Sequence, residues 1–212
     1  MYFKDFIYFY PENPLLVHRD QSLIDELSDD PNFIGEPKYN GSRLELHILN
    51  GGIQYWTRHG EKFKMFDGHP DVEDGLSQFP KDSYFLFDVE LRHNKVIGVR
   101  NKLVIFDCFI YDGLFLNHKT FGERRNLLEN HFEKDLDGQY YDTQAVSLIN
   151  QYKTDFRKVF ETYTEGYYGI NPDEFEGLVI KNLTKKFNLG RKSNHESRWM
   201  YKMRKETGRH KF

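Results

Sequence analysis

Alternation of apolar and polar residues predicts several β-strands in this chain. Residues 43–49 and 53–58 are two alternating runs around Asn50-Gly51-Gly52, which is typical of a β-hairpin with a tight turn. Residues 84–91 also alternate, with apolar side chains on one face and carboxylates on the other. Further strands are expected at residues 95–99, 103–110 and 176–181.

Helical patterns are fewer and shorter. A Ser-x-x-Asp pattern that resembles a capping box predicts a short helix over residues 22–27, and a Thr-x-x-Glu capping box predicts a second helix over residues 120–132. Apolar residues recur at helical spacing over residues 145–163, and Gly166 is placed to cap that helix. Residues 1–19 are expected to be irregular. The mixture predicts an α+β fold with largely antiparallel sheets, not a doubly wound parallel sheet.

The composition favours a soluble globular protein with an aromatic core. The chain has 212 residues, of which 17% are aromatic and 30% charged. No apolar run approaches the roughly 20 residues that span a bilayer, and the N-terminus lacks a signal-peptide pattern. The single cysteine, Cys108, excludes an internal disulfide and fits a reducing compartment.

The charge is unevenly distributed. Residues 181–211 contain 11 Lys or Arg and 2 Asp or Glu, a balance of +9, whereas the whole chain carries −3. The other residues therefore carry −12. A basic end on an acidic chain indicates a polyanionic partner such as nucleic acid, although a solvated basic tail explains the same pattern.

The segment from Glu36 to Arg43 contains the strongest candidate for a nucleophile, Lys38. We expect this lysine at the mouth of the following strand rather than within a strand. A lysine amine attacks only in its neutral form, and nearby cations such as Arg43, Lys181 or Lys202 favour that form. Gly41 allows the backbone to approach a phosphate closely. The alternative is an ordinary surface turn with a solvated lysine.

Two carboxylates, Asp88 and Glu90, share the non-aromatic face of the strand at residues 84–91. Buried carboxylates are costly unless they bind something, and a hydrated Mg²⁺ ion or sugar hydroxyls would fit. A sheet face open to water is the alternative.

Later segments offer weaker candidates. Glu176 and Lys181 flank an apolar strand, and each is equally explained as a strand end. Lys202 and Arg204 fall on one face if their segment is extended, which suits either phosphate binding or a surface strand. Phe106 is more simply a core residue than a side chain that stacks on a base.

Taken in order, these segments resemble the sequential motifs of the covalent nucleotidyltransferases, and most closely those of small ATP-dependent DNA ligases. The resemblance covers about residues 15–205 and rests on six ordered segments. They are Lys38-x-x-Gly41-x-Arg43, Thr57-Arg58-x-Gly60, Asp88-x-Glu90, Phe106-Asp107, Glu176-Gly177-x-x-x-Lys181 and Lys202-x-Arg204. Three more features support it: Glu36, the Phe121-Gly122-Glu123-Arg124-Arg125-x-x-Leu128 segment, and Gly190-Arg191-Lys192-Ser193.

The resemblance implies a function and a role for each residue. The fold would be the DNA-ligase nucleotidyltransferase fold, with two largely antiparallel sheets flanked by helices. Lys38 would form a covalent bond to AMP from ATP, and the AMP would pass to the 5′-phosphate of a nick in duplex DNA. The other implied roles are adenine contact by Glu36, stacking by Phe106, phosphate binding by Arg43 and Arg58, ribose or Mg²⁺ binding by Glu90, Mg²⁺ binding by Glu176, and clamping of the α-phosphate by Lys181, Lys202 and Arg204.

The resemblance also implies boundaries and a setting. Residues 1–205 would form the adenylation domain, and residues 206–212 either a C-terminal stub or the linker to the OB-fold domain that the family has and this sequence lacks. We expect a monomer that acts in the cytoplasm of a bacterium or a phage-infected cell, without membrane association.

Departures from the family pattern keep alternatives open. Asn40 stands where the family has aspartate, and Trp199 precedes Lys202 by one residue more than usual, which leaves the final phosphate clamp open between Lys202 and Arg204. An RNA ligase or a capping-type enzyme, with RNA as partner, is therefore one alternative. A non-catalytic nucleic-acid-binding domain on the same fold is another.

Overall fold

The computed structural model describes residues 1–17, 20–141, 144–188 and 196–206. The chain divides into two compact units, each assembled from separate segments. Unit 1 comprises Met1–Glu12, Gly41–Ile149 and Thr184–His195, and unit 2 comprises Asn13–Asn40, Asn150–Leu183 and Glu196–Phe212. Gly190–Ser193 and the end of the predicted stub, residues 207–212, lie outside the described residues.

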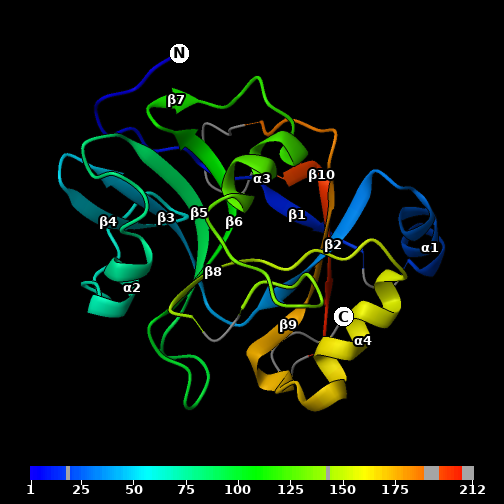
Figure 1. Ribbon diagram of the computed structural model, residues 1–212. Coiled ribbons are helices and arrows are strands. Elements are labelled where there is room, and N and C mark those ends of the chain that lie inside the picture. The colour runs from blue at the N-terminus through cyan, green and yellow to red at the C-terminus, as the bar shows by residue number, and fades with distance from the viewer. Residues whose placement is uncertain (18–19, 142–143, 189–195, 207–212) are drawn as a thin grey trace. The chain divides into compact units, whose positions relative to one another are not determined.

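Unit 1 is built on a sheet in the order β4-β3-β5-β6-β7, with β8 beside β6 (Figure 1). All its pairs are antiparallel except that of β6 with β8, which is parallel. The strands are β3 (Ser42–Leu49), β4 (Gly52–Thr57), β5 (Phe85–Arg92), β6 (Lys102–Tyr111), β7 (Leu114–Phe115) and β8 (Val146–Leu148).

The sheet of unit 1 is fastened to a helix by a buried ion pair. Unit 1 contains α2 (Pro70–Gly75) and α3 (Phe121–Glu129), and α3 packs against β6. Arg124 of α3 is fully buried, and its Nε and Nη2 donate to the two carboxylate oxygens of Asp107, each at 2.7 Å. This bidentate geometry is the strongest that an arginine forms with a carboxylate. It explains why an arginine follows the capping box.

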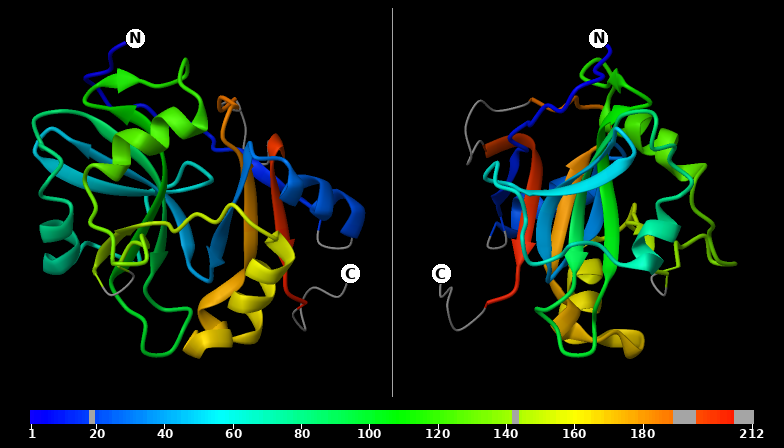
Figure 2. Two further views of the ribbon diagram at one scale, coloured as in Figure 1. Left: turned by 45° about the vertical axis from the view of Figure 1, so that its right-hand side comes forward. Right: turned by 90° about the vertical axis from the view of Figure 1, so that its left-hand side faces the viewer.

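Unit 2 is built on a sheet in the order β1-β10-β9-β2. Strands β10, β9 and β2 are antiparallel neighbours, and β1 joins β10 in parallel. The elements are β1 (Asn13–Leu16), α1 (Gln21–Asp29), β2 (Phe33–Tyr39), α4 (Phe156–Glu165), the 3₁₀ turns η1 (Tyr167–Gly169) and η2 (Pro172–Glu174), β9 (Phe175–Asn182) and β10 (Glu196–Arg204). Helix α4 packs on β9 and β2, and α1 packs on α4 (Figure 2).

Most predictions that rest on local pattern are confirmed. The hairpin over β3 and β4, the strands β5, β6 and β9, and the α+β class with antiparallel sheets are all present. The side chain of Thr120 accepts from the backbone N–H of Glu123, and the carboxylate of Glu123 accepts from the backbone N–H of Thr120, so the second capping box is confirmed. Gly166 ends α4 in the left-handed conformation, with φ 77°. No helix in the described ranges is long and apolar enough to cross a membrane.

Other predictions are wrong, and one of them fails because strand pairing at a distance overrode the local pattern. Helix α1 is capped by Asp20 instead of Ser22. The run over residues 145–163 divides into strand β8, which pairs with β6, and helix α4. Residues 95–99 form a loop, and α3 ends at Glu129 rather than near residue 132.

Two further corrections concern the first 40 residues. The segment at 1–19 is not wholly irregular, because Asn13–Leu16 forms β1. Lys38 lies within β2 rather than at the mouth of β3.

Candidate active site

Strand register brings the predicted cations of unit 2 onto one face of its sheet. Lys38 of β2 lies opposite Gly177 of β9, and Arg204 of β10 lies opposite the same glycine. Two residues further along β9, Val179 lies opposite both Glu36 of β2 and Lys202 of β10. Because directly opposed side chains point to the same side of a sheet, these four residues share a face. The register therefore makes both Lys202 and Arg204 available beside Lys38.

A β-bulge brings Glu176 to this cluster. The register shifts between Lys38 and Tyr39, so that Glu176 has no opposed residue on β2. Gly177 has φ 149°, and a Cβ there would lie 2.1 Å from the carbonyl oxygen of Met203. Only glycine fits so close an approach of two strands. The bulge re-aims the Glu176 side chain.

The Glu176 carboxylate holds the nucleophile candidate. Nζ of Lys38 donates to Oε2 of Glu176, and Nη2 of Arg204 lies 3.2 Å from the same oxygen. The side chains of Lys38, Glu176 and Arg204 are 26%, 18% and 28% exposed. Each is therefore ordered by an ion pair yet open to solvent on one side, as an incoming substrate requires.

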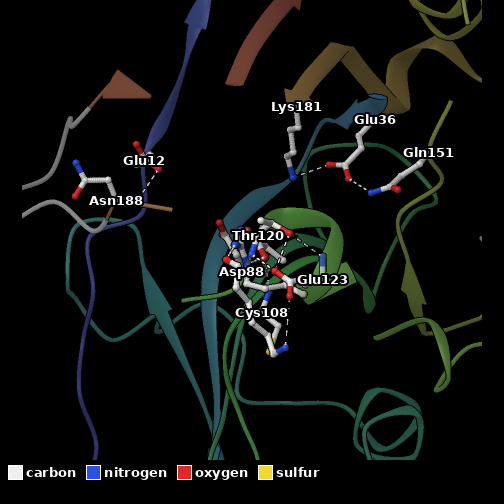
Figure 3. A network of polar contacts seen from close by, with 12 residues as sticks. Glu12, Glu36, Asp88, Cys108, Thr120, Glu123, Gln151, Lys181 and Asn188 are labelled. Atoms are coloured by element: carbon white, nitrogen blue, oxygen red, sulfur yellow. Dashed lines mark hydrogen bonds and ion pairs between the residues drawn. The ribbon is translucent and has the colours of Figure 1, made fainter. Parts of the chain in front are cut away.

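Glu36 is held in a second, buried cluster on the same face. Its carboxylate is 1% exposed and lies 2.6 Å from Nζ of Lys181. Nε2 of Gln151 donates to the other oxygen at 2.8 Å (Figure 3). Two backbone hydrogen bonds of 2.9 Å between Gly35 and Tyr152 hold the segment that carries Gln151. Sequence reasoning missed Gln151, because nothing local marks it as a partner of a residue so far away in the chain.

Asn40 uses its amide as a donor. Nδ2 of Asn40 donates to the carbonyl of Asp173 at 3.2 Å, and its backbone N–H donates to the carbonyl of Glu174 at 2.8 Å. An aspartate at this position has no N–H to donate to Asp173. The asparagine therefore fixes the end of β2 in a way that the family's aspartate cannot.

In unit 1, Arg43 is paired with Asp88. Nε and Nη2 of Arg43 donate to the two oxygens of Asp88 at 3.0 and 2.6 Å, and Nη1 donates to the carbonyl of Glu12 at 2.9 Å. Burial alone would lower the pKa of Arg43, but the charge and hydrogen bonds of Asp88 outweigh it and raise that pKa. Asp88 is only 2% exposed, so the alternative of a sheet face open to water is wrong for this residue.

A second β-bulge sets the position of Phe106. Asp88 opposes Asp107 and Val89 opposes Ile105, so Phe106 has no opposed residue on β5. It is half-buried, and its ring centre lies 5.6 Å from the guanidinium carbon of Arg43. The simple alternative of a fully buried core phenylalanine therefore does not hold. Phe106 and Glu176 are thus each the extra residue of a β-bulge, and the bulge sets the orientation of the side chain.

Glu90 lies at the end of this group. It opposes Arg43 across the β3–β5 pair. A Cβ on Gly41 would lie 2.7 Å from Cγ of Glu90 and 2.7 Å from the carbonyl oxygen of Leu91. Glycine is thus required at position 41 for packing against β5, and its predicted close approach to a phosphate stays a prediction. Arg58 is exposed and donates to the neighbouring His59 at 3.3 Å, and no hydrogen bond or ion pair within the described part of the chain joins it to the other predicted residues.

A buried polar chain crosses the same strand, β3. Nε2 of His47 lies 3.3 Å from Oε2 of Glu45, and both side chains are 0% exposed. Burial, and then the charge of Asp88, raise the pKa of Glu45 well above its ordinary value, and burial lowers the pKa of His47 to about 3. Burial thus favours the neutral form of both side chains, and Nδ1 of His47 lies 2.8 Å from the hydroxyl of Tyr84.

The donor set is suited to Mg²⁺ only together with phosphate oxygens. Among the described residues, no group of three or more His, Cys, Asp or Glu side chains could hold a metal ion. Mg²⁺ is usually bound by one or two carboxylates, waters and substrate phosphates. Within unit 2, the carboxylate of Glu176 beside Lys38 and Arg204 fits that kind of binding.

The fold is that of the nucleotidyltransferase domains of DNA ligases. Mycobacterial DNA ligase D in complex with ATP and MES has a TM-score of 0.60 and 16% identity, and the match covers 94% of this chain and 62% of that one. An archaeal ATP-dependent RNA ligase has a TM-score of 0.50 and 13% identity, with 93% of this chain and 48% of that one covered. At such identities the likeness concerns the fold alone.

The sequence comparison defines the family. The family model of the ATP dependent DNA ligase domain matches residues 85–204, which is more than half of the chain. This chain therefore belongs to the ATP-dependent DNA ligase domain family. The DNA ligase of Nanoarchaeum equitans is 26% identical over 184 residues, in a match that covers 74% of this chain and 30% of that protein. The chain thus spans less than a third of that relative's length.

Proposed function

We propose that the protein catalyses the adenylation step of DNA ligation. The amine of Lys38 attacks the α-phosphorus of ATP, forms a phosphorus–nitrogen bond and expels pyrophosphate. The AMP is then passed to the 5′-phosphate of a nick in duplex DNA, and the 3′-hydroxyl displaces it to form the phosphodiester bond. The observation that carries this proposal is the meeting of Lys38, Glu176 and Arg204 at the bulge of β9, in a chain of the DNA ligase family.

The residues of unit 2 are suited to the first half of this chemistry. Phosphoryl transfer needs positioning and neutralisation of charge more than acid–base catalysis. Lys202 and Arg204 share the face of Lys38 and would neutralise the α-phosphate as charge builds on it. Lys181 would join them on leaving Glu36, whose freed carboxylate would accept from the amino group of adenine.

The residues of unit 1 have proposed roles of their own in binding the nucleotide. Phe106 would stack on the adenine, and Arg43 beside it keeps the ring in place. Arg43 and Arg58 would contribute to phosphate binding, and Glu90 would bind the ribose or Mg²⁺. When bound, Mg²⁺ supplies neutralisation of the phosphate charge, with Glu176 as its carboxylate ligand.

The setting follows from this activity. We propose nicked duplex DNA as the partner of a monomer that acts in the cytoplasm. The one cysteine is buried as a free thiol, which agrees with a reducing compartment.

The covalent state of Lys38 tests the proposal. The protein is incubated with ATP and Mg²⁺ and, separately, with pre-adenylated nicked DNA, and the mass of the intact protein and of its peptides is measured. We expect one AMP on Lys38, none in Lys38→Ala, and an unchanged yield in Lys158→Ala, which removes an exposed lysine of α4. Absence of the adduct from both donors would contradict the proposal.

Matched substrates separate the rival activities. The shared fold of the archaeal RNA ligase makes RNA the second candidate partner. Nicked DNA and nicked RNA duplexes of the same sequence are compared, and we expect AMP transfer to DNA. Transfer to RNA alone would favour the RNA ligase alternative, and labelling by GTP in place of ATP would favour a capping-type enzyme.

A further inference from the structure

The loop between β5 and β6 is a basic part of unit 1 that the nucleotide chemistry does not use. From Leu91 to Phe106 the sequence contains four Lys or Arg and no Asp or Glu, in a chain whose net charge is −3. Arg92 and Lys102 oppose each other where the two strands end, and Lys95 and Arg100 lie in the loop itself. In Figure 1 this loop extends beyond the ends of its two strands.

The loop has a defined conformation. Nδ1 of His93 lies 2.8 Å from Oδ1 of Asn101, which ties its two ends together. The backbone N–H of Val99 donates to the carbonyl of Val96 at 3.2 Å and closes the tip. Nζ of Lys95 donates to the carbonyl of Gly41. The loop is therefore anchored to Gly41, which immediately precedes β3.

An apolar side chain occupies the tip of this basic loop. Ile97 is fully exposed, at 102% of its reference area, and Arg100 is exposed three residues later. A single exposed isoleucine is ordinary on a protein surface. Here, however, the isoleucine stands on an ordered turn between cations, which are the two kinds of group that proteins present to a nucleic-acid duplex. Cations bind the phosphates, and an apolar wedge enters the groove between the strands.

We propose that the β5–β6 loop binds duplex DNA beside the nick, with Arg100 on a backbone phosphate and Ile97 in the groove. The choice of nicked DNA as the ligand rests on the proposed function, whereas the loop's chemistry fits any nucleic-acid duplex. A protein partner is less favoured, because the apolar surface at the tip is one side chain within a run of positive charge. The contact gives unit 1 a role in holding the substrate that is separate from nucleotide chemistry.

Two variants with matched controls test the loop. Arg100→Ser and Ile97→Ser each change one exposed loop side chain. Lys81→Ser is the control for the first, since Lys81 is a cation of unit 1 whose side chain is 41% exposed, with Glu73 as its neighbour at 3.8 Å. Leu136→Ser is the control for the second, because Leu136 is 106% exposed elsewhere on unit 1. Binding of the full chain to a labelled nicked duplex is measured by fluorescence anisotropy at several salt concentrations.

The two variants have different expected signatures. Arg100→Ser should weaken binding. It should also make the negative slope of log K against log[salt] shallower by about 0.9, the value for one lost phosphate contact on duplex DNA. Ile97→Ser should weaken binding by roughly 3- to 10-fold without changing that slope, because it removes an apolar contact. The control variants should bind like the unaltered chain. A nicked RNA duplex tests whether the loop distinguishes the two kinds of duplex. Equal losses of affinity for both duplexes would mean that the loop contacts the sugar-phosphate backbone, which DNA and RNA both have.

Failure of the loop proposal and failure of the proposed function are distinguishable. Anisotropy requires no catalysis, and self-adenylation with ATP requires no DNA. If both variants keep the affinity and salt slope of the unaltered chain, the loop proposal is overturned even where Lys38 becomes adenylated. If binding falls as expected while no AMP is found on Lys38, the loop proposal stands and the adenylation proposal fails.

Discussion

Replacing Glu45 by glutamine should stabilise the protein relative to the unaltered chain, and this advantage should grow as the pH rises. Glu45 is completely buried in β3, where burial and the charge of Asp88 raise the pKa of its carboxyl well above the ordinary value of 4.5. The folded protein therefore keeps a proton on Glu45 at pH values where the unfolded chain has released it. Glutamine has nearly the same shape, is always neutral and can still donate toward Nε2 of His47.

The size of the effect follows from proton linkage. Below about pH 4.5 both states of the unaltered protein are protonated at Glu45, and this group makes no pH-dependent difference. Above it the folded state binds one proton more than the unfolded state, so stability falls by about 1.4 kcal/mol per pH unit until the pH reaches the folded pKa. The Glu45→Gln variant lacks this loss. Its advantage in unfolding free energy should thus grow from pH 5 to pH 6, with about 1.4 kcal/mol per pH unit as the upper limit.

His47 changes stability in the opposite direction and must be separated. Burial lowers its pKa from 6.5 to about 3, so its contribution is lost as the pH falls below 6.5. Because His47 is present in both proteins, the difference between them removes its contribution. Urea unfolding followed by tryptophan fluorescence at pH 5 and pH 6 gives the two free energies. Glu73→Gln, which changes a carboxylate that is 52% exposed, is the control and should show no such trend.

A difference between Glu45→Gln and the unaltered protein that stays constant from pH 5 to pH 6 would refute this reasoning. It would mean that Glu45 ionises in the folded protein as it does in the unfolded chain. The pH at which the advantage levels off reports the folded pKa directly.

Two further predictions concern the buried ion pair and the lysine segment. Arg124→Met should lower the unfolding free energy by about 3 to 5 kcal/mol, because it leaves the carboxylate of Asp107 buried without its partner. Arg157→Met, whose pair with Asp25 is exposed, should cost no more than about 1 kcal/mol, and equal losses in urea unfolding would contradict the assignment. Asn40→Asp should give no gain in the single-turnover rate of adenylation, since a carboxylate cannot donate to the carbonyl of Asp173; a faster rate would show that charge matters more than this hydrogen bond.

The features that sequence alone determined are those with local causes. The apolar alternation of β5 and the turn between β3 and β4 arise from neighbouring residues, as does the capping box at Thr120, and all three are present. The order of the charged segments was also sufficient to indicate the DNA ligase family, because an ordered series of motifs is specific where each motif is weak. The family model that matches residues 85–204 confirms this interpretation.

Tertiary structure decided where the functional side chains point and what they contact. Glu176 and Phe106 each occupy a β-bulge, and a bulge depends on the register between strands that are distant in sequence. Long-range contacts likewise placed Lys38 within β2. They also paired Arg43 with Asp88 and positioned Gln151 to donate a hydrogen bond to Glu36. A period-2 pattern specifies that a strand has two faces. Only the neighbouring strands determine which residue forms a β-bulge and which ion pairs form. The sequence alone therefore determined the candidate chemistry and its order, whereas long-range strand pairing determined its geometry.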